Sequence, residues 1–390
     1  MSCYITSNNN WVYVATEGSY GQAAAITGRS RIPLIKLAAR QAPEQTQRRD
    51  KSGSRTFAGL PNRIRKRTQF QLNTPMTQWA DQSSAPSQGP LFQAAMGSPA
   101  ALFAGGLVAE VTNQTQIQFM AAHGLSAGQG VTFGGEIRFV AAIQDAATVV
   151  VNAPISTAPA AGASIGATAT YKLATDVGSV SLFDFWDPST AVQRILNGAA
   201  ADVMKIKVNG DFHEFEFSGP SRDLLDSASF SSGLAGLTDF PQEPVQAGFD
   251  YTVVPGHLGQ VWMGATSQRF YTLTGAELQL KNNIELRVKE FGSDSARCIA
   301  GGERAVALQF SIFEQDDAQT KGLYQAARQR SPIEVMLQLG QQAGQLLGMY
   351  LPAMIPEVPE FDDGESRLEW KFQNSRAQGS VDDELYIAFG

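Results

Sequence analysis

The sequence has little of the chemistry that metalloproteins and disulfide-rich proteins use. Its 390 residues include two cysteines, Cys3 and Cys298, and only three histidines. Two cysteines cannot build a disulfide framework or a multi-cysteine zinc site. The histidines lie far apart in sequence and show no paired metal-ligand spacing. We therefore expect neither a metal site nor another cofactor.

Long apolar runs are missing as well. No run approaches the ~18 residues that a membrane-spanning helix requires. The opening residues, MSCYITSNNNW, lack the basic and apolar regions of a secretory signal. Hydrophobic residues still make up 43% of the chain, which is enough for sizeable cores and too many for a disordered polypeptide. We expect a folded protein of two or three domains with no membrane partner.

Catalytic motifs are equally scarce. The run Gly124–Gly128 (GLSAG) matches the pattern of a hydrolase nucleophile elbow, and His123 precedes it. That motif needs a helix after its serine, whereas QGVTFGG, a turn and strand pattern, follows here. Acid pairs such as Asp316-Asp317 lie in turn-like stretches without a partner motif. We interpret Ser126 as part of a turn between strands and predict that the protein is not an enzyme.

Alternation of apolar and polar residues with period 2 dominates what remains, and this pattern is typical of half-buried strands. It runs from Arg67 to Leu72, from Val306 to Ile312 and from Leu368 to Phe372. Asn209-Gly210 separates two such runs, which is a strong hairpin signal. Short helices are predicted within 90–104, 188–197 and 321–330. The sequence thus predicts a mainly β, mostly antiparallel protein.

Three blocks of sequence recur in the same order, which indicates an internal duplication. SGSRTFAGLPNRIRKRTQFQL from Ser52 matches SDSARCIAGGERAVALQFSIF from Ser293. LFQAAMGSP from Leu91 then matches LYQAARQRSP from Leu323, and NGDFHEFEFSGPSR from Asn209 matches DGESRLEWKFQNSR from Asp363. Each half is expected to be an antiparallel β-unit with one flanking helix.

The spacing of the matched blocks also marks an insertion. Leu91 to Gly210 spans 119 positions, whereas Leu323 to Gly364 spans 41. Residues 106–172, rich in Ala, Gly, Val and Thr with short strand patterns, account for most of the excess and predict a small β-barrel-like domain. The predicted domains are 1–105 with 173–235, the insertion 106–172, and 236–390.

Charge is distributed unevenly along the chain. The net charge is −7, yet residues 28–67 carry twelve Lys or Arg and only two acids. The last 34 residues carry nine acids and three bases. We predict that this basic arm contacts the acidic region of another copy, although its phosphate affinity also leaves nucleic-acid binding open. The arm comprises Arg48, Arg49, Lys51, Arg55, Arg63, Arg65, Lys66 and Arg67, and the acidic complement Glu360, Asp362, Asp363, Glu365, Asp382 and Asp383.

The second half resembles the tail tube (major tail) proteins of long-tailed phages. The resemblance rests on SDSARCIAGGERAVALQFSIFEQDD, LYQAARQRSPIEVMLQLG, MYLPAMIPEVPEFDDGESRLEWKFQNSR and DDELYIAFG, and on VATEGSYGQ near the start. It covers 250–390 well, 10–100 and 178–220 more weakly, and excludes 106–172. It implies β-sandwich or partial-barrel units, each with a flanking helix, whose sheets join side by side around a lumen. A duplicated chain would need three copies for a pseudo-sixfold ring.

The same resemblance implies where the protein acts and what it meets. Stacked rings would form the hollow tail of the virion, assembled in the bacterial host cytoplasm. The implied partners are further copies of the chain, the tape measure protein and genomic DNA in the lumen, and tail terminator and tip proteins at the ends. Ala307, Gln309, Ser311 and Glu334 are the predicted lumen lining. The alternative is a host- or carbohydrate-binding β-protein with 106–172 as its binding module.

Overall fold

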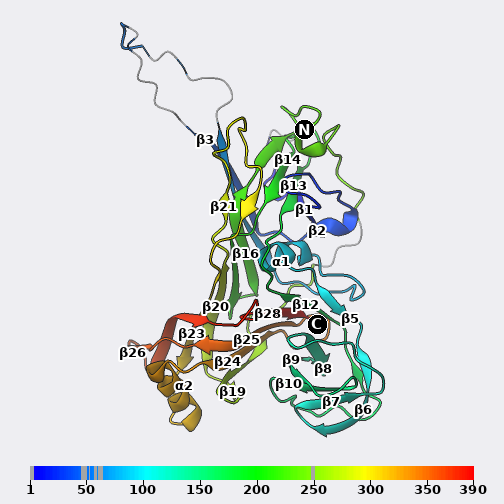
Figure 1. Cartoon of the computed structure of the whole chain (residues 1–390), viewed down its shortest axis with the longest axis vertical. Helices are drawn as coiled ribbons and strands as arrows, with labels where there is room; N and C mark the ends of the chain where they lie inside the picture. The colour runs from blue at the N-terminus through cyan, green and yellow to red at the C-terminus, as the bar shows by residue number, and fades with distance from the viewer. Residues whose placement is uncertain (1–3, 45–50, 52, 57–58, 60–64, 247–250) are drawn as a thin grey trace.

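The computed structural model describes residues 4–44, 51, 53–56, 59, 65–246 and 251–390 (Figure 1). Of the predicted basic arm, Arg48, Arg49 and Arg63 lie outside these described residues. The described chain is mainly β, with 28 strands and two α-helices. This confirms the fold class that the period-2 patterning predicts.

The first half of the chain forms two antiparallel sheets and one helix, which we call the first unit. One sheet has the strand order β17-β14-β13-β1-β2, and the other contains β15-β16-β4-β3. The elements are β1 Asn10–Thr16, η1 Gly28–Ser30, β2 Arg31–Ile32, β3 Lys36–Pro43, β4 Lys66–Pro75, α1 Gly89–Met96, β13 Val180–Trp186, β14 Arg194–Ala199, β15 Val203–Val208, β16 Glu214–Ser221 and β17 Asp223–Asp226.

The second half, which we call the second unit, repeats this strand order. Its series are β28-β25-β24-β18-β19 and β26-β27-β23-β20, and α2 follows β23 as α1 follows β4. The elements are β18 Gly259–Gly264, β19 Gln268–Phe270, β20 Leu273–Lys281, β23 Ala305–Phe313, α2 Ala318–Gln329, β24 Ile333–Leu339, β25 Leu347–Ile355, β26 Glu360–Asp362, β27 Glu369–Ala377 and β28 Tyr386–Phe389. The connector holds η2 Leu234–Gly236, and the loop after β20 holds the small hairpin β21 Glu285–Leu286 and β22 Ile299–Ala300.

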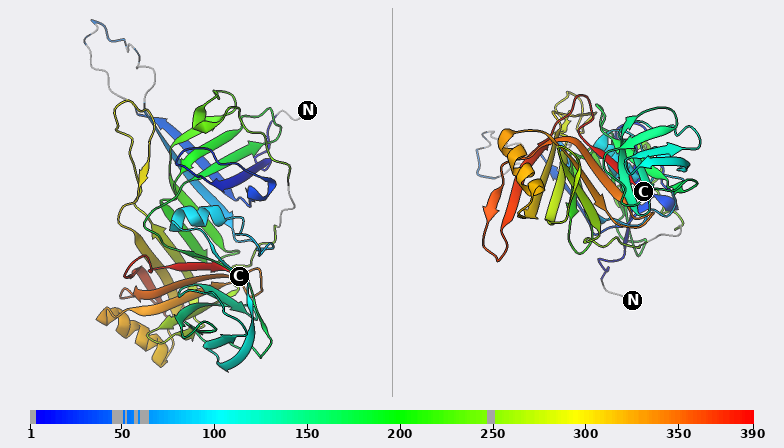
Figure 2. Two further views of the ribbon diagram at one scale, coloured as in Figure 1. Left: turned by 45° about the vertical axis from the view of Figure 1, so that its right-hand side comes forward. Right: turned by 90° about the horizontal axis from the view of Figure 1, so that it is seen from below.

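The two units are joined edge to edge by main-chain pairing. β15 of the first unit pairs antiparallel with β20 of the second over six residues, from Val203↔Lys281 to Val208↔Ala276. The result is one sheet in the order β26-β27-β23-β20-β15-β16-β4-β3, which we call the shared sheet. It runs the length of the molecule in Figures 1 and 2. The β15–β20 pairing is called the internal seam below.

The inserted segment forms its own sheet in the order β11-β6-β7-β10-β9-β8. It has a separate apolar core that includes Val108, Ile117 and Val149. The strands are β6 Gly106–Asn113, β7 Gln116–Phe119, β8 Gly130–Phe133, β9 Glu136–Ile143, β10 Thr148–Val151 and β11 Ser164–Ile165. We call residues 106–165 the module; it lies beside the second unit (Figure 2).

The end of the module differs from the predicted boundary at residue 172. β12 (Thr168–Lys172) pairs with β5 (Ala101–Phe103) on one side and with β28 on the other. The apolar residues of β12 are buried against the units, because Tyr171 lies beside Phe92 of α1 and Phe389 of β28. The strand pattern alone could not show which sheet this segment would join.

Several local predictions are confirmed and one is wrong. β4, α1, α2 and the hairpin of β15 and β16 about Asn209-Gly210 lie where the patterns place them. The helix predicted at 188–197 does not form. Instead Arg194–Asn197 lies between β13 and β17 and hydrogen-bonds to both. Tertiary pairing on two sides outweighs the weak helical propensity of this short stretch.

The two helices are set differently in their units. Phe92 of α1 is fully buried, and its ring meets those of Phe215, Phe217 and Phe389 edge-on at 5.2–5.3 Å. α2 begins at the N-cap Asp317, whose carboxylate accepts from the Thr320 amide, and it buries a narrow stripe at Leu323 and Ala327. The first helix is therefore a core element, whereas the second covers its unit from outside.

Candidate assembly surface

The two outer edges of the shared sheet are the candidate assembly site. Within the described part of the chain, no strand pairs with the outer edge of β3 or with the outer edge of β26. Because the units repeat, β3 corresponds to β20 and β26 corresponds to β15. The molecule thus exposes one copy of each edge that it joins at its internal seam. Open edges of this kind favour pairing with another chain.

One face of the shared sheet is polar along its whole width. On β23, Ala307, Gln309 and Ser311 point away from the core. The residues that alternate with them are buried, namely Val306, Leu308, Phe310 and Ile312. The same register continues across the seam, where Gln279 pairs with both Ala307 and Lys205. This face also includes Lys36, Ala38, Arg40, Gln69, Gln71, Asn73, Lys207, Glu214, Glu216, Glu277 and Lys371.

The polar face mixes charges of both signs. Lys205 Nζ lies 3.0 Å from Glu277 Oε1 across the internal seam. Asn73 donates to Glu214 between β4 and β16. Basic and acidic side chains therefore alternate over the face with glutamines between them, and no block of positive charge forms on its described part.

Glu334 does not belong to this face, although it was predicted to line the same surface. It lies on β24, in the other sheet of the second unit, and accepts from Ser267 Oγ at 3.0 Å. Burial raises the pKa of its carboxyl, and the Ser267 hydrogen bond opposes that shift. Alternation along β24 could not reveal which of the two sheets this strand would enter.

The described part of the predicted basic arm lies in and beside the loop between β3 and β4. Lys51, Arg55 and Lys66 are exposed. Arg67 pairs with Glu44 at 2.7 Å across the hairpin, and Arg65 donates to the Glu290 carbonyl of the second unit at 3.3 Å. Arg65 and Arg67 thus already have hydrogen-bonding partners within the chain. The corresponding loop of the second unit, with β21, lies at the same end of the molecule (Figure 1).

The predicted acidic residues fall into two separate groups. Glu360, Asp362, Asp363 and Glu365 lie on β26 and the turn that follows it. Asp382 instead pairs with Arg304 at 2.7 Å, and Asp383 accepts from the Ser380 amide. Only the first group lies at an open sheet edge. All six residues lie within the last 34 residues of the chain, and this closeness in sequence did not show that they belong to two separate groups.

The module is held to the second unit by a buried polar network. Arg138 of β9 is fully buried, 3.2 Å from Glu136 and 5.0 Å from the ring centroid of Trp262 on β18. Its guanidinium donates to the side-chain oxygens of Gln338 at 3.2 Å and Gln260 at 3.1 Å. Burial lowers the pKa of Arg138 to about 10, against the opposing effect of Glu136. No sequence motif marks this arrangement.

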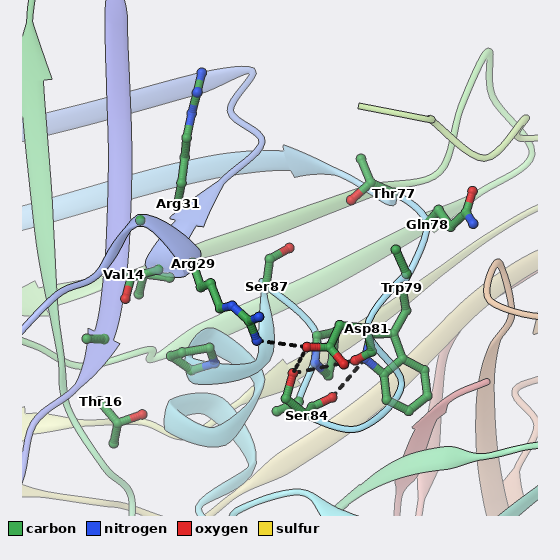
Figure 3. A pocket seen from close by; sticks show the side chains of 17 residues that line it. Val14, Thr16, Arg29, Arg31, Thr77, Gln78, Trp79, Asp81, Ser84 and Ser87 are labelled. Carbon is green, nitrogen blue, oxygen red and sulfur yellow. Dashed lines mark hydrogen bonds and ion pairs between the residues drawn. The ribbon is translucent and has the colours of Figure 1, made fainter. Parts of the chain in front are cut away.

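A cleft of about 610 Å³ opens in the first unit between η1 and the segment before α1 (Figure 3). Arg29 Nη1 lies 2.9 Å from Asp81 Oδ2 in it, and the Trp79 indole donates to the Ser84 carbonyl. Among the described residues that line it there is neither histidine nor cysteine. The Asp81 carboxylate also accepts from the Ser84 hydroxyl at 3.2 Å, so Asp81 is held by Arg29 and Ser84 together.

Comparisons with known proteins give little. No protein-family model and no curated protein matches the sequence. Among solved structures, the chain is similar to the SPP1 tail tube determined by solid-state NMR and cryo EM, at 14% identity and a TM-score of 0.26, over 32% of this chain and 78% of that one. A TM-score this low does not define a shared fold.

None of the helices in the described chain has the length and apolar character needed to cross a membrane. Within the same residues, no cluster of three or more His, Cys, Asp or Glu side chains is placed to hold a metal ion.

Proposed function

We propose that this protein is a structural subunit of a virus tail tube, in which three copies close into a ring and rings stack into a hollow tube. The observation that carries the proposal is the internal seam. Two units of the same strand order are joined through unlike edges, β15 against β20. A head-to-tail contact of this kind, repeated between molecules, generates either a closed ring or an open helix.

The size of the shared sheet suits a ring with a channel. Each copy contributes eight strands to it. Three copies would then form a barrel much larger than the roughly 16 strands at which barrels begin to leave an aqueous channel. Closure would also remove both open edges, which is the most complete protection that a sheet can have against uncontrolled pairing.

The polar face of the shared sheet would then line the channel. Its alternating Lys and Glu side chains, separated by Gln69, Gln71, Gln279 and Gln309, offer little net attraction to a polyanion. We propose that DNA passes along this face without being held, and that the tape measure protein occupies it before ejection. Terminator and tip proteins would cap the two ends of the stack, inside the virion tail.

The experiment is direct observation of the purified full-length chain. Negative-stain microscopy is expected to show rings or tubes, and mass photometry of the ring fraction is expected to give three times the 41.9 kDa chain mass. A species that stays monomeric over the accessible concentration range would overturn the proposal and favour a host- or carbohydrate-binding role. A two-fold dimer as the end state would overturn it too.

A further inference from the structure

The repeat of the two units makes it possible to derive the contact between neighbouring copies residue by residue. Resting on the proposed function, we infer that β26 of one copy pairs antiparallel with β3 of the next, in the register of the internal seam. We call this contact the external seam. It places Phe361 opposite Ala39 and Glu360 opposite Arg40.

The register follows from equivalent positions in the two hairpins beside each seam. In the first unit Ile206 pairs with Phe215 of β16, and in the second unit Phe361 pairs with Trp370 of β27. Phe215 and Trp370 each begin the buried alternation of their strand. Ile206 of β15 therefore corresponds to Phe361 of β26.

The opposite edge is fixed in the same way. Phe217 of β16 pairs with Leu72, and its counterpart Phe372 pairs with Phe310. Leu72 is thus equivalent to Phe310, two residues away from the match that the sequence blocks suggest. Since Leu37 pairs with Leu72 and Ala276 pairs with Phe310, Leu37 corresponds to Ala276.

The partner position of β3 follows by counting along the strand. If Leu37 corresponds to Ala276, then Ala39 corresponds to Leu278. In the internal seam Ile206 faces Leu278, so in the external seam Phe361 faces Ala39. Moving one position along each antiparallel strand places Glu360 opposite Arg40 and Asp362 opposite Ala38.

Phe361 is as exposed as expected for a residue that β3 of a neighbouring copy would cover. Its equivalent Ile206 is fully buried against Leu278, whereas Phe361 is 57% exposed. It is already ordered, because its ring stacks on Trp370 with centroids 5.3 Å apart. Pairing with β3 would cover this ring beside the small Ala39, whereas the internal seam fills the equivalent space with Leu278.

The charges of the two seams are arranged with opposite polarity. At the internal seam the bases Lys205 and Lys207 lie on β15, and Glu277 of β20 lies opposite Lys207, with Lys281 at the far end of β20. At the external seam Glu360 would face Arg40 directly, and Asp362, which already pairs with Lys371 of its own chain, would lie diagonally from Lys36. Opposite charges facing each other on neighbouring strands favour pairing.

This reversal would prevent wrong pairings. Pairing of β26 with β20 would set Asp362 against Glu277, and pairing of β15 with β3 would set two basic strands against each other. Each molecule can therefore close its own seam and still select the next molecule in one direction only. Like-charge repulsion against the competing partner is an effective source of such specificity.

The register can be tested with a cysteine pair. Glu360→Cys and Arg40→Cys are combined with Cys3→Ser and Cys298→Ser in the full-length chain. The two positions lie on opposite edges of an eight-stranded sheet, about 34 Å apart at ~4.8 Å per strand, so a disulfide must join different molecules. Oxidised rings are expected to give covalent trimers. A matched pair, Glu360→Cys with Lys36→Cys, is off register and should cross-link far less.

The charge pattern is tested separately. Glu360→Lys with Asp362→Lys is expected to lower ring yield by about tenfold or more, since the repulsion recurs at every seam. Adding Lys36→Glu and Arg40→Glu to the same chain should restore rings. If the parent forms rings but the on-register cysteine pair does not cross-link, the external seam is overturned and the proposed function is not. The same holds if the variant with all four charge reversals fails to form rings. A parent without rings overturns the proposed function and the seam together.

Discussion

The guanidinium carbon of Arg138 lies 5.0 Å from the ring centroid of Trp262, with the side chain of Arg138 fully buried. These residues come from different parts of the fold, Arg138 from the module and Trp262 from the second unit. The contact shows that the module is docked through a desolvated cation as well as through apolar surface around Phe139 and Tyr350. Such a cation is tolerated only where its donors are satisfied.

Replacing the cation should therefore be costly. Arg138→Met keeps much of the volume but leaves the Glu136 carboxylate buried without its ion pair. It also removes one of the two donors to each of the side-chain oxygens of Gln260 and Gln338. We expect the free energy of unfolding to fall by about 3–5 kcal/mol. Denaturant unfolding followed by tryptophan fluorescence measures this directly.

The matched control is the double variant Glu136→Gln with Arg138→Met. Removing both charges should recover part of the lost stability, because no unpaired charge then remains in the interface. A single Arg138→Met variant as stable as the parent would show that the network contributes little.

Replacing the partly buried carboxyl of Glu334 should stabilise the folded protein, in contrast to the loss of stability expected for Arg138→Met. Because burial raises the pKa of its carboxyl, the folded state binds more protons than the unfolded state between the usual and the raised pKa. Stability is then lost as pH rises through that window. Glu334→Gln should stabilise the protein at pH 7 by up to about 1 kcal/mol, and the gain should vanish in acid. Unfolding curves at pH 4 and pH 7 test both signs, and a destabilised variant at pH 7 would contradict them.

The module should be removable at a hairpin. Phe103 of β5 and Thr168 of β12 are directly paired, so a two-residue Asn-Gly turn can replace residues 104–167. The units are expected to fold and to form rings, although the apolar surface at Met336 and Tyr350 becomes exposed and solubility falls. Mass photometry of the shortened chain gives the test. Loss of rings in a well-folded variant would give the module a role in assembly.

The basic arm remains a hypothesis for ring stacking. Reversing Arg48, Arg49, Lys51 and Arg55 to Glu is expected to shorten tubes and lower their yield while single rings persist, because the described Lys51 and Arg55 lie between β3 and β4, outside the paired strands. Tube length measured by electron microscopy, with reversal of the exposed Arg328 on α2 as control, checks this. Unchanged tubes would count against an arm that joins rings.

Several features could be predicted from particular residues. Alternation at Arg67–Leu72 and Val306–Ile312 predicts strands because only period 2 keeps one face apolar, and both strands form as β4 and β23. Asn209-Gly210 predicts its hairpin because these residues adopt positive φ readily, and Asn209 has φ 66°. The lumen candidates Ala307, Gln309 and Ser311 share one face for the same reason, whereas Glu334 required knowledge of the sheet that β24 joins.

The sequence by itself determined the long alternating strands such as β4 and β23, the repetition of the two halves and the two faces of those strands, because these depend on local periodicity and on the order of blocks. Only the tertiary structure decided which edges meet. The pairing of β15 with β20, the entry of β12 beside β28 and the burial of Arg138 between two domains all join residues distant in sequence. Hydrogen bonding between strand edges is nearly independent of side-chain identity, so no local pattern could have specified those partners.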